Sequence, residues 1–296
     1  MVRLHRHSVV VGTSLLTLAV LGPAGVALAD SGAAAGGRGG AECEPLEPYS
    51  PGNFSDPTGI NNRYLSMVPG TQLVYEGQTA EGRHQVVFTV TDLVKVVDDV
   101  TARVIYDVDL ADGEVVEAEL AFFAQDGQGN VWSLGEYPEE FENGEFIGAP
   151  DVWLAGKENT QPGIHMPANP EQVEGVHYLQ GRNPKIDFLD CATIVDRDGE
   201  LTVPAGHFTN ILTTHETSPL ESSTAIQTKE HAPDVGIVRI GAIDDPEGET
   251  LELTQHVQLG PEQRDRLNQE AIALDAHGHS DTVSPLYRST PPVQLG

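Results

Sequence analysis

The sequence predicts a mainly β protein, with one large curved antiparallel sheet and one C-terminal helix. Three observations support this fold class: apolar and polar residues alternate in several runs, turn signals separate these runs at short intervals, and a helical period occurs near the end of the chain. Short connections favour antiparallel pairing of neighbouring strands. These patterns leave three shapes open, namely a half barrel, a whole barrel and a sandwich.

The N-terminus has the three parts of a secretory signal peptide. Arg3 and Arg6 precede an apolar run over residues 9–21, and Ala27 and Ala29 are small residues at the positions that a signal peptidase reads. The run is shorter than the roughly 20 residues that a membrane span needs. We therefore predict a signal peptide over residues 1–29, cleavage after Ala29 and a secreted protein with no stable membrane anchor; an uncleaved anchor is the alternative.

Residues 30–43 are rich in Gly and Ala, which predicts a flexible tether, because such a segment buries too little apolar surface to offset its ordering entropy. The antiparallel β domain is predicted over residues 44–260. The chain has two cysteines, Cys43 and Cys191. Outside the cell an isolated pair of this kind is typically oxidised, so we expect a disulfide that ties the start of the fold to its middle.

The predicted mature chain is strongly acidic. Without residues 1–29, 14 Lys and Arg remain against 45 Asp and Glu, which gives a net charge of −31. This excess repels nucleic acid and anionic lipid, so neither is expected as a partner. It is typical of a soluble secreted protein, and it would attract divalent cations, although no cofactor is identified from the sequence.

The strand pattern is clearest between residues 86 and 124. Val86, Phe88 and Val90 share one face. In the next run, Ala102 to Leu110 place apolar side chains on one face, and Asp107 and Asp109 lie on the other. The run over 116–124 repeats this alternation, with Glu117 and Glu119 opposed to the apolar side chains, and residues 237–243 and 251–259 do so again.

The C-terminal segment differs from the strands. Residues 261–276 are predicted to form a helix, because Pro261 suits its first turn and Glu262 its positive end. Leu267, Ala271 and Leu274 form an apolar stripe that we expect to cover a sheet edge or a barrel mouth. Residues 277–296 contain three prolines and little core material, which predicts a mobile or surface-draped tail.

Several phrases of the chain resemble a family of secreted or lipoprotein-type bacterial β proteins that are uncharacterised. The resemblance extends over residues 61–259 and rests on Asn62 to Thr71, Leu73 to Gly77, Gln125-Asp126, Gly129 to Trp132, Gly135-Glu136, Pro162 to Ile164, Met166 to Pro170, Val203 to Gly206 with Phe208 and Asn210, and Ala232 to Gly236. It implies an exported β protein, and it implies no catalytic residues.

A cluster of aromatic side chains is the candidate ligand site. It comprises Trp132, Tyr137, Phe141, Phe146 and Trp153. On a curved sheet such residues line a groove for an apolar or carbohydrate-type ligand, although aromatics of this kind also pack ordinary cores. The predicted ligand-binding residues are Trp132, Tyr137, Trp153, Met166 and Asn169.

His277, His279 and Asp281 are the candidate metal ligands, since imidazole and carboxylate groups within five residues suit zinc or copper. Spare polar residues of a tail are the alternative. Asp126, Gln128 and Asn130 place oxygen atoms at every second position, but the glycine and the distant glutamate of a calcium loop are missing, so a hairpin turn is favoured.

The function remains open between three classes. A secreted module that binds an apolar or carbohydrate-type ligand, or a partner, is favoured, because the chain contains no nucleophile elbow, zinc signature or phosphate loop. An extracellular metal- or carboxylate-dependent hydrolase is the first alternative. It predicts that at least three histidines of the set His165, His177, His207, His215 and His231 converge with an acid. A structural envelope protein is the second alternative.

Overall fold

The computed structural model describes residues 43–296 with the exception of residues 221, 223 and 247. The predicted signal peptide and residues 30–42 of the predicted tether lie outside the described residues. None of the described helices is both long and apolar enough to cross a membrane.

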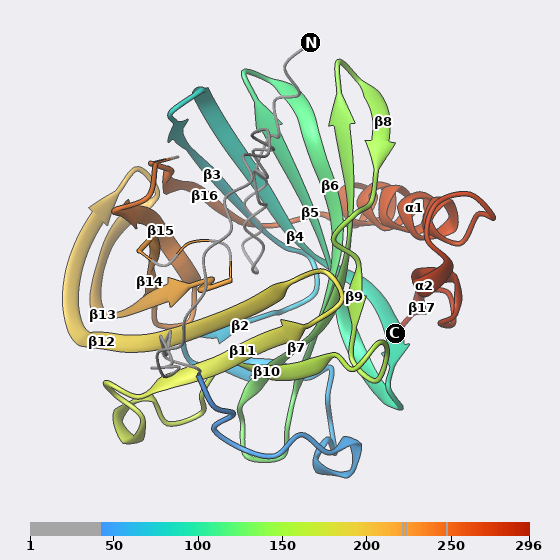
Figure 1. Cartoon of the computed structure of the whole chain (residues 1–296). Coiled ribbons are helices and arrows are strands. Elements are labelled where there is room, and N and C mark those ends of the chain that lie inside the picture. Colours follow the sequence, from blue (N-terminus) through green and yellow to red (C-terminus); the bar gives the residue numbers. More distant parts are fainter. Residues whose placement is uncertain (1–42, 221, 223, 247) are drawn as a thin grey trace, which may run out of the picture.

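Twelve strands of the described chain form a closed antiparallel barrel (Figure 1). Eleven pairings follow the order β10-β11-β12-β13-β14-β15-β16-β3-β4-β5-β6-β7, and β7 then pairs with β10 and closes the ring. The prediction of a curved antiparallel sheet is therefore confirmed in its whole-barrel form. The barrel strands are β3 (Thr71–Thr79), β4 (Gly82–Val97), β5 (Val100–Ala111), β6 (Glu114–Gln125), β7 (Val131–Glu142), β10 (Gln161–Met166), β11 (His177–Asn183), β12 (Phe188–Val203), β13 (Gly206–Thr217), β14 (Ile226–Ala232), β15 (Gly236–Ile243) and β16 (Thr250–Gln258).

Shorter elements complete the described fold. They are η1 (Pro51–Asn53), β1 (Asn61–Asn62), β2 (Leu65–Ser66), β8 (Glu145–Gly148), β9 (Trp153–Leu154), η2 (Pro170–Gln172), α1 (Pro261–Gly278), α2 (Pro285–Arg288) and β17 (Gln294–Leu295). Of these, β8 and β9 pair with β7, and β17 pairs with β4.

One part of the barrel interior is apolar. Side chains of β3, β4, β12, β15 and β16 pack together there, with Phe88, Ile194 and Leu251 as buried examples. Residues 60–67, which contain the small β1–β2 sheet, join this cluster through Tyr64 and Met67. The N-terminal segment of the described chain therefore completes the apolar core.

The outer face of β4–β7 carries a second apolar cluster, which α1 and α2 cover (Figure 1). Ala271 and Leu274 of the predicted helical stripe belong to this cluster. The helix lies on an outer sheet face, whereas the sequence pattern predicts that it covers a sheet edge or a barrel mouth. Contrary to the expectation of little core material in the tail, α2 buries Tyr287 in this cluster and β17 extends the sheet beside β4.

The alternation of β5 and β6 has an unexpected orientation in the barrel. Asp107, Asp109, Glu117 and Glu119 share their face with Ile105, which belongs to the interior cluster. The opposite, more apolar face points outward toward the C-terminal helices, where its side chains find a partner. Acidic side chains consequently line the inside of this part of the barrel.

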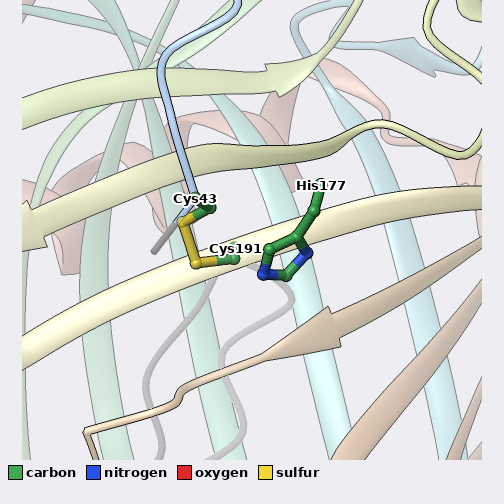
Figure 2. Close-up of side chains that lie close together, drawn as sticks. All are labelled: Cys43, His177 and Cys191. Atoms are coloured by element: carbon green, nitrogen blue, oxygen red, sulfur yellow. A yellow bond between two sulfur atoms is a disulfide. The ribbon is translucent and has the colours of Figure 1, made fainter. Parts of the chain in front are cut away.

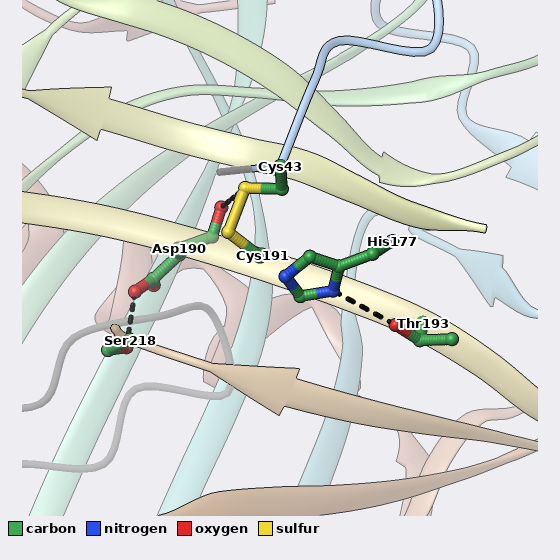
Figure 3. Close-up of a disulfide and its surroundings, with 6 residues drawn as sticks. All are labelled: Cys43, His177, Asp190, Cys191, Thr193 and Ser218. Atoms are coloured by element: carbon green, nitrogen blue, oxygen red, sulfur yellow. Dashed lines mark hydrogen bonds between the residues drawn. A yellow bond between two sulfur atoms is a disulfide. The ribbon is translucent and has the colours of Figure 1, made fainter. Parts of the chain in front are cut away.

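A disulfide joins Cys43 to Cys191 of β12 across a sequence separation of 148 (Figure 3). Next to it, Glu44 forms a parallel bridge with Tyr178, and the Leu179 amide donates to the Glu44 carbonyl at 3.1 Å. The predicted disulfide is therefore present, and it fastens the start of the described chain to the barrel wall.

Candidate functional site

A group of polar side chains from four strands meets inside the barrel, and we call it the polar hub. It consists of His165 of β10, Tyr178 and Gln180 of β11, Thr214 and Glu216 of β13, and Lys229 and His231 of β14. All seven side chains are buried. Pairing of Thr214 with Lys229, and of Leu212 with His231, sets β13 and β14 in register, so that their inward residues face the same space.

An ion pair forms the centre of the polar hub. The Lys229 Nζ atom lies 2.6 Å from Glu216 Oε2, and the lysine is 0% exposed. Gln180 Nε2 donates to Glu216 Oε1 at 3.2 Å, and the Thr214 hydroxyl lies 3.5 Å from the same oxygen. Burial raises the pKa of Glu216, but the charge of Lys229 and its hydrogen bonds lower it to about 2. Glu216 is therefore a carboxylate at neutral pH.

The two histidines of the polar hub are neutral at neutral pH. Burial lowers the pKa of His165 to about 4 and that of His231 to about 3. A neutral imidazole offers one donor and one acceptor. His231 Nε2 lies 3.4 Å from the Thr214 hydroxyl, while the His165 ring packs edge-on against Phe123 at 5.3 Å.

Five side chains of the polar hub keep polar atoms without a hydrogen-bond partner among the described residues. These atoms are both ring nitrogens of His165, the Tyr178 hydroxyl, Gln180 Oε1, His231 Nδ1 and Lys229 Nζ, and the last of them contacts Glu216 through the ion pair alone. A buried polar atom without a partner costs about 1–3 kcal/mol, and native proteins contain few of them. These atoms lie around one ion pair, and a water molecule or a small ligand at this place would satisfy them.

A second charged region lies on the inner face of β5, β6 and β7. We call it the acidic wall, and it consists of Asp107, Asp109, Glu117, Glu119 and Glu136, all of them buried. In the sheet, Asp107 is the direct partner of Glu119, and Asp109 is the direct partner of Glu117. Burial and the neighbouring carboxylates raise the pKa of Glu119 well above its usual range.

His84 lies at one end of the acidic wall. Its Nδ1 atom is 2.7 Å from Glu249 Oε1, and its Nε2 atom is 3.4 Å from Asp109 Oδ2. Burial by itself lowers the pKa of His84, but the hydrogen bonds to Asp109 and Glu249 outweigh burial and raise it to about 10. His84 is therefore a cation at neutral pH. Glu249 also interacts electrostatically with Lys229, so it connects the acidic wall with the polar hub.

Asp190 is a further buried carboxyl of the interior, next to the disulfide (Figure 3). The Ser218 hydroxyl donates to Asp190 Oδ1 at 2.5 Å. Burial raises the pKa of Asp190 to about 7, against the lowering effect of this hydrogen bond and of Lys229. The ionisation of Asp190 is therefore costly in the folded protein.

The structure separates the five predicted ligand-binding residues. Trp132 packs on the outside against Tyr49, with ring centroids 5.6 Å apart, and Tyr137 stacks on Tyr287 at 4.1 Å beneath the C-terminal helices. Asn169 is exposed at the start of η2. Met166 belongs to the interior apolar cluster.

Trp153 is the one predicted aromatic that faces the interior with a free polar atom. Its Cα partner is Glu136 of the acidic wall, and its ring stacks on Phe188 with centroids 5.0 Å apart. Gly181 permits this arrangement, because a Cβ atom there would lie 2.9 Å from the Phe188 ring. Trp153 is 0% exposed, and its Nε1 atom has no hydrogen-bond partner among the described residues.

The three candidate metal ligands point to different partners. His277 Nδ1 lies 2.7 Å from Glu139 Oε1, His279 lies 2.8 Å from the Asp275 carbonyl, and Asp281 forms an ion pair with Arg288. A metal role for them stays a prediction.

Within the described residues, the group of side chains close enough to hold a metal ion is Cys43, His177 and Cys191 (Figure 2). Its two sulfur atoms are bonded to each other, so they are not available as thiolate ligands.

Two of the five histidines named for the hydrolase alternative meet an acid in the interior, namely His165 and His231 beside Glu216. His177 and His215 lie on β11 and β13 with partly exposed side chains, and His207 pairs with Thr202 at 2.9 Å near the surface. The convergence is smaller than the hydrolase alternative predicts.

Sequence reasoning missed most of the polar hub. A signal existed, because Thr214 and Glu216 are two residues apart on one strand, and Lys229 and His231 are two residues apart on the next. Such spacing places each pair on one strand face. Only closure of the barrel shows that this polar face is the inner one.

No model of a known protein family matches the chain, and no curated protein sequence matches it. Two solved structures do match part of it. A protein from Bacteroides fragilis, described as exported and as having a YmcC-like fold, is 13% identical with a TM-score of 0.35, and the match covers 66% of this chain and 99% of that chain.

The second solved structure is a protein from Parabacteroides distasonis that is described as a lipoprotein. It is 17% identical with a TM-score of 0.32, and the match covers 66% of this chain and 99% of that chain. Both matched proteins are of the kind that the sequence resemblance named. Neither description names a ligand or an activity.

Proposed function

We propose that this protein is an exported β-barrel that binds a small polyhydroxylated, carbohydrate-type ligand inside the barrel, at the polar hub. The observation that carries the proposal is the set of buried polar atoms of His165, Tyr178 and Gln180 that have no partner among the described residues. A guest that supplies these hydrogen bonds removes a cost of about 1–3 kcal/mol for each atom.

The chemistry of the polar hub suits sugar hydroxyl groups. A hydroxyl both donates and accepts, and so do the phenol of Tyr178 and a neutral imidazole, whereas Gln180 Oε1 accepts. The low pKa values of His165 and His231, which follow from burial, keep both imidazoles neutral over the whole range above about pH 4. Neutral, two-way partners favour a ligand with many hydroxyl groups.

The stacked pair of Trp153 and Phe188 adds an apolar surface to the interior. Aromatic rings that keep one polar atom serve sugar binding well, because the ring contacts apolar C–H surface and the N–H binds a hydroxyl. The Trp153 Nε1 atom is such a donor.

Export is part of the proposal. The signal-peptide pattern of residues 1–29 and the disulfide between Cys43 and Cys191 support it, since stable disulfides belong to oxidising compartments. The hydrolase alternative has less support, because the carboxylate of Glu216 is neutralised by Lys229 at 2.6 Å and two histidines, not three, accompany it.

Titration calorimetry of the purified protein with the neutral disaccharide of N-acetylglucosamine tests the proposal. We expect measurable binding that Tyr178→Phe weakens about tenfold, because one hydrogen bond of roughly 1–1.5 kcal/mol is lost. Tyr106→Phe is the matched control, since Tyr106 lies on the outer face of β5. Absence of binding to this disaccharide and to a panel of other neutral sugars, or equal losses in both variants, would overturn the proposal.

A further inference from the structure

We propose that the ligand of the barrel carries amino groups, so that it is an amino sugar whose positive charges bind the acidic wall while its hydroxyl groups bind the polar hub. This inference rests on the proposed function for its sugar part. Beyond that function, the buried carboxyl groups of the acidic wall favour a ligand with positive charges.

Four acids of the acidic wall oppose one another across β5 and β6. Asp107 opposes Glu119, and Asp109 opposes Glu117, on the same inner face of β5 and β6. Burial beside other carboxyl groups makes the ionisation of Glu119 costly, which raises its pKa. A positively charged guest at this face offsets that cost, because it stabilises the ionised carboxylate.

Glu119 is the member of the acidic wall that is buried without a hydrogen-bond partner in the described part of the chain. Its side chain is 1% exposed, and neither carboxyl oxygen has a hydrogen-bond partner among the described residues. The residue shares its strand face with Ala121 and Phe123 of the interior cluster, so the carboxyl group points into the barrel. A buried carboxyl group without a partner is the position where a protonated amine gains most, because charge-assisted hydrogen bonds are about twice as strong as neutral ones.

Trp153 and Glu249 connect the acidic wall with the polar hub. Trp153 is the Cα partner of Glu136, and its ring lies against Phe188 and close to Gly181, the residue after Gln180 of the polar hub. From the other side, Glu249 interacts with His84 and Asp109 as well as with Lys229. One guest with hydroxyl groups at one end and amines at the other therefore has both sets of partners within the same barrel.

The arrangement of the carboxyl groups favours an organic cation over a metal ion. Calcium needs six to eight oxygen atoms around a single point. Among the described residues, the acids of the wall do not form a group of three ligand atoms within 4.8 Å of one another. Acids distributed over β5, β6 and β7 instead suit a ligand whose charges are separated along its length.

The test compares two disaccharides, that of N-acetylglucosamine, which is neutral, and its de-N-acetylated form at slightly acidic pH, where the amines are protonated. We expect the amino form to bind at least about tenfold more tightly to the wild-type protein, with an affinity that falls as salt increases. Glu119→Gln should remove most of this advantage and leave the neutral disaccharide within about twofold. Glu114→Gln, an exposed acid on the same strand, is the matched control.

The outcomes separate the two proposals. Equal affinity of the two disaccharides overturns the amino-sugar inference and leaves the proposed function standing. If the amino form binds tightly and Tyr178→Phe leaves its affinity unchanged, the result supports amine binding at the acidic wall and overturns sugar binding at the polar hub. If calcium chloride binds, Glu119→Gln weakens that binding and the amino form has no advantage, the acidic wall binds a metal ion and the amino-sugar inference is overturned. Absence of any binding overturns both proposals.

Discussion

The two faces of β4–β7 both bury ionisable side chains, but these side chains differ in their hydrogen-bond partners. On the outer face, Lys95 is 0% exposed beneath the C-terminal helices. Its Nζ atom lies 3.2 Å from Asp275 Oδ1 and 2.6 Å from the Pro291 carbonyl, and 4.1 Å from the centre of the Tyr287 ring. On the inner face, Glu119 is equally buried, and its oxygens have no hydrogen-bond partner among the described residues.

This difference indicates which buried charged group stabilises the folded structure. Lys95 is surrounded by partners from α1, α2 and the segment that follows them, so it fixes the C-terminal segment to the barrel wall. The Glu119 carboxyl group makes no comparable contact among the described residues, and its burial makes ionisation costly. We interpret the outer charge as structural and the inner charges as binding groups. The following three predictions test that division, beginning with the largest effect.

Lys95→Ala should destabilise the protein by about 3–5 kcal/mol, because the substitution leaves the buried carboxylate of Asp275 without its cation. The measurement is the free energy of unfolding from urea titration. Arg266→Ala is the control, since its ion pair with Glu270 at 3.9 Å is exposed and should cost about 0.5 kcal/mol or less. A loss of only about 1 kcal/mol for Lys95→Ala would show that the outer charge is not structural.

Asp190→Asn should stabilise the protein, in contrast to Lys95→Ala, and the gain should depend on pH. The pKa of Asp190 is about 7 in the folded protein against 3.8 in the unfolded chain, because of burial. The folded state therefore binds more protons between these values, and stability falls as pH rises from about 4 to about 7. Removal of the ionisable group should recover on the order of 2–4 kcal/mol above that window and almost nothing below it.

Thermal unfolding of wild type and Asp190→Asn across this pH range measures the difference. Asp196→Asn, an exposed acid on the same strand, provides the control and should leave the pH profile unchanged. An Asp190→Asn variant with the wild-type pH profile would contradict a costly inner charge. The Ser218 hydroxyl keeps an acceptor in the variant, so a change of packing does not obscure the result.

Ser284→Ala should have the smallest effect, a loss of about 1 kcal/mol. The Ser284 hydroxyl caps α2 by accepting a hydrogen bond from the Tyr287 amide at 3.2 Å, and Tyr287 in turn contacts Lys95. Ser289→Ala, at the exposed end of α2, should cost only a few tenths of a kcal/mol. Thermal unfolding measures the stability of both variants. Equal losses of stability would show that the Ser284 cap does not help to hold Tyr287 against Lys95.

The sequence by itself determined the β class, the C-terminal helix and the pairing of Cys43 with Cys191. These features follow from local periodicity and from the presence of two cysteines in a chain with an export pattern. It also assigned Asp107 and Glu119 to strand faces opposite to apolar ones, because side chains alternate along any strand.

Only the tertiary structure decided which of those faces is the inside. The pairing of β7 with β10 closes the barrel, and the contact of α1 with the outer surface gives the apolar face its partner. Both are long-range contacts that no local pattern encodes, so the sequence showed that Thr214 and Glu216 share a strand face but not that this face lies inside a barrel beside Lys229. A strand pattern specifies two faces, but burial of either one depends on what the rest of the chain places against it.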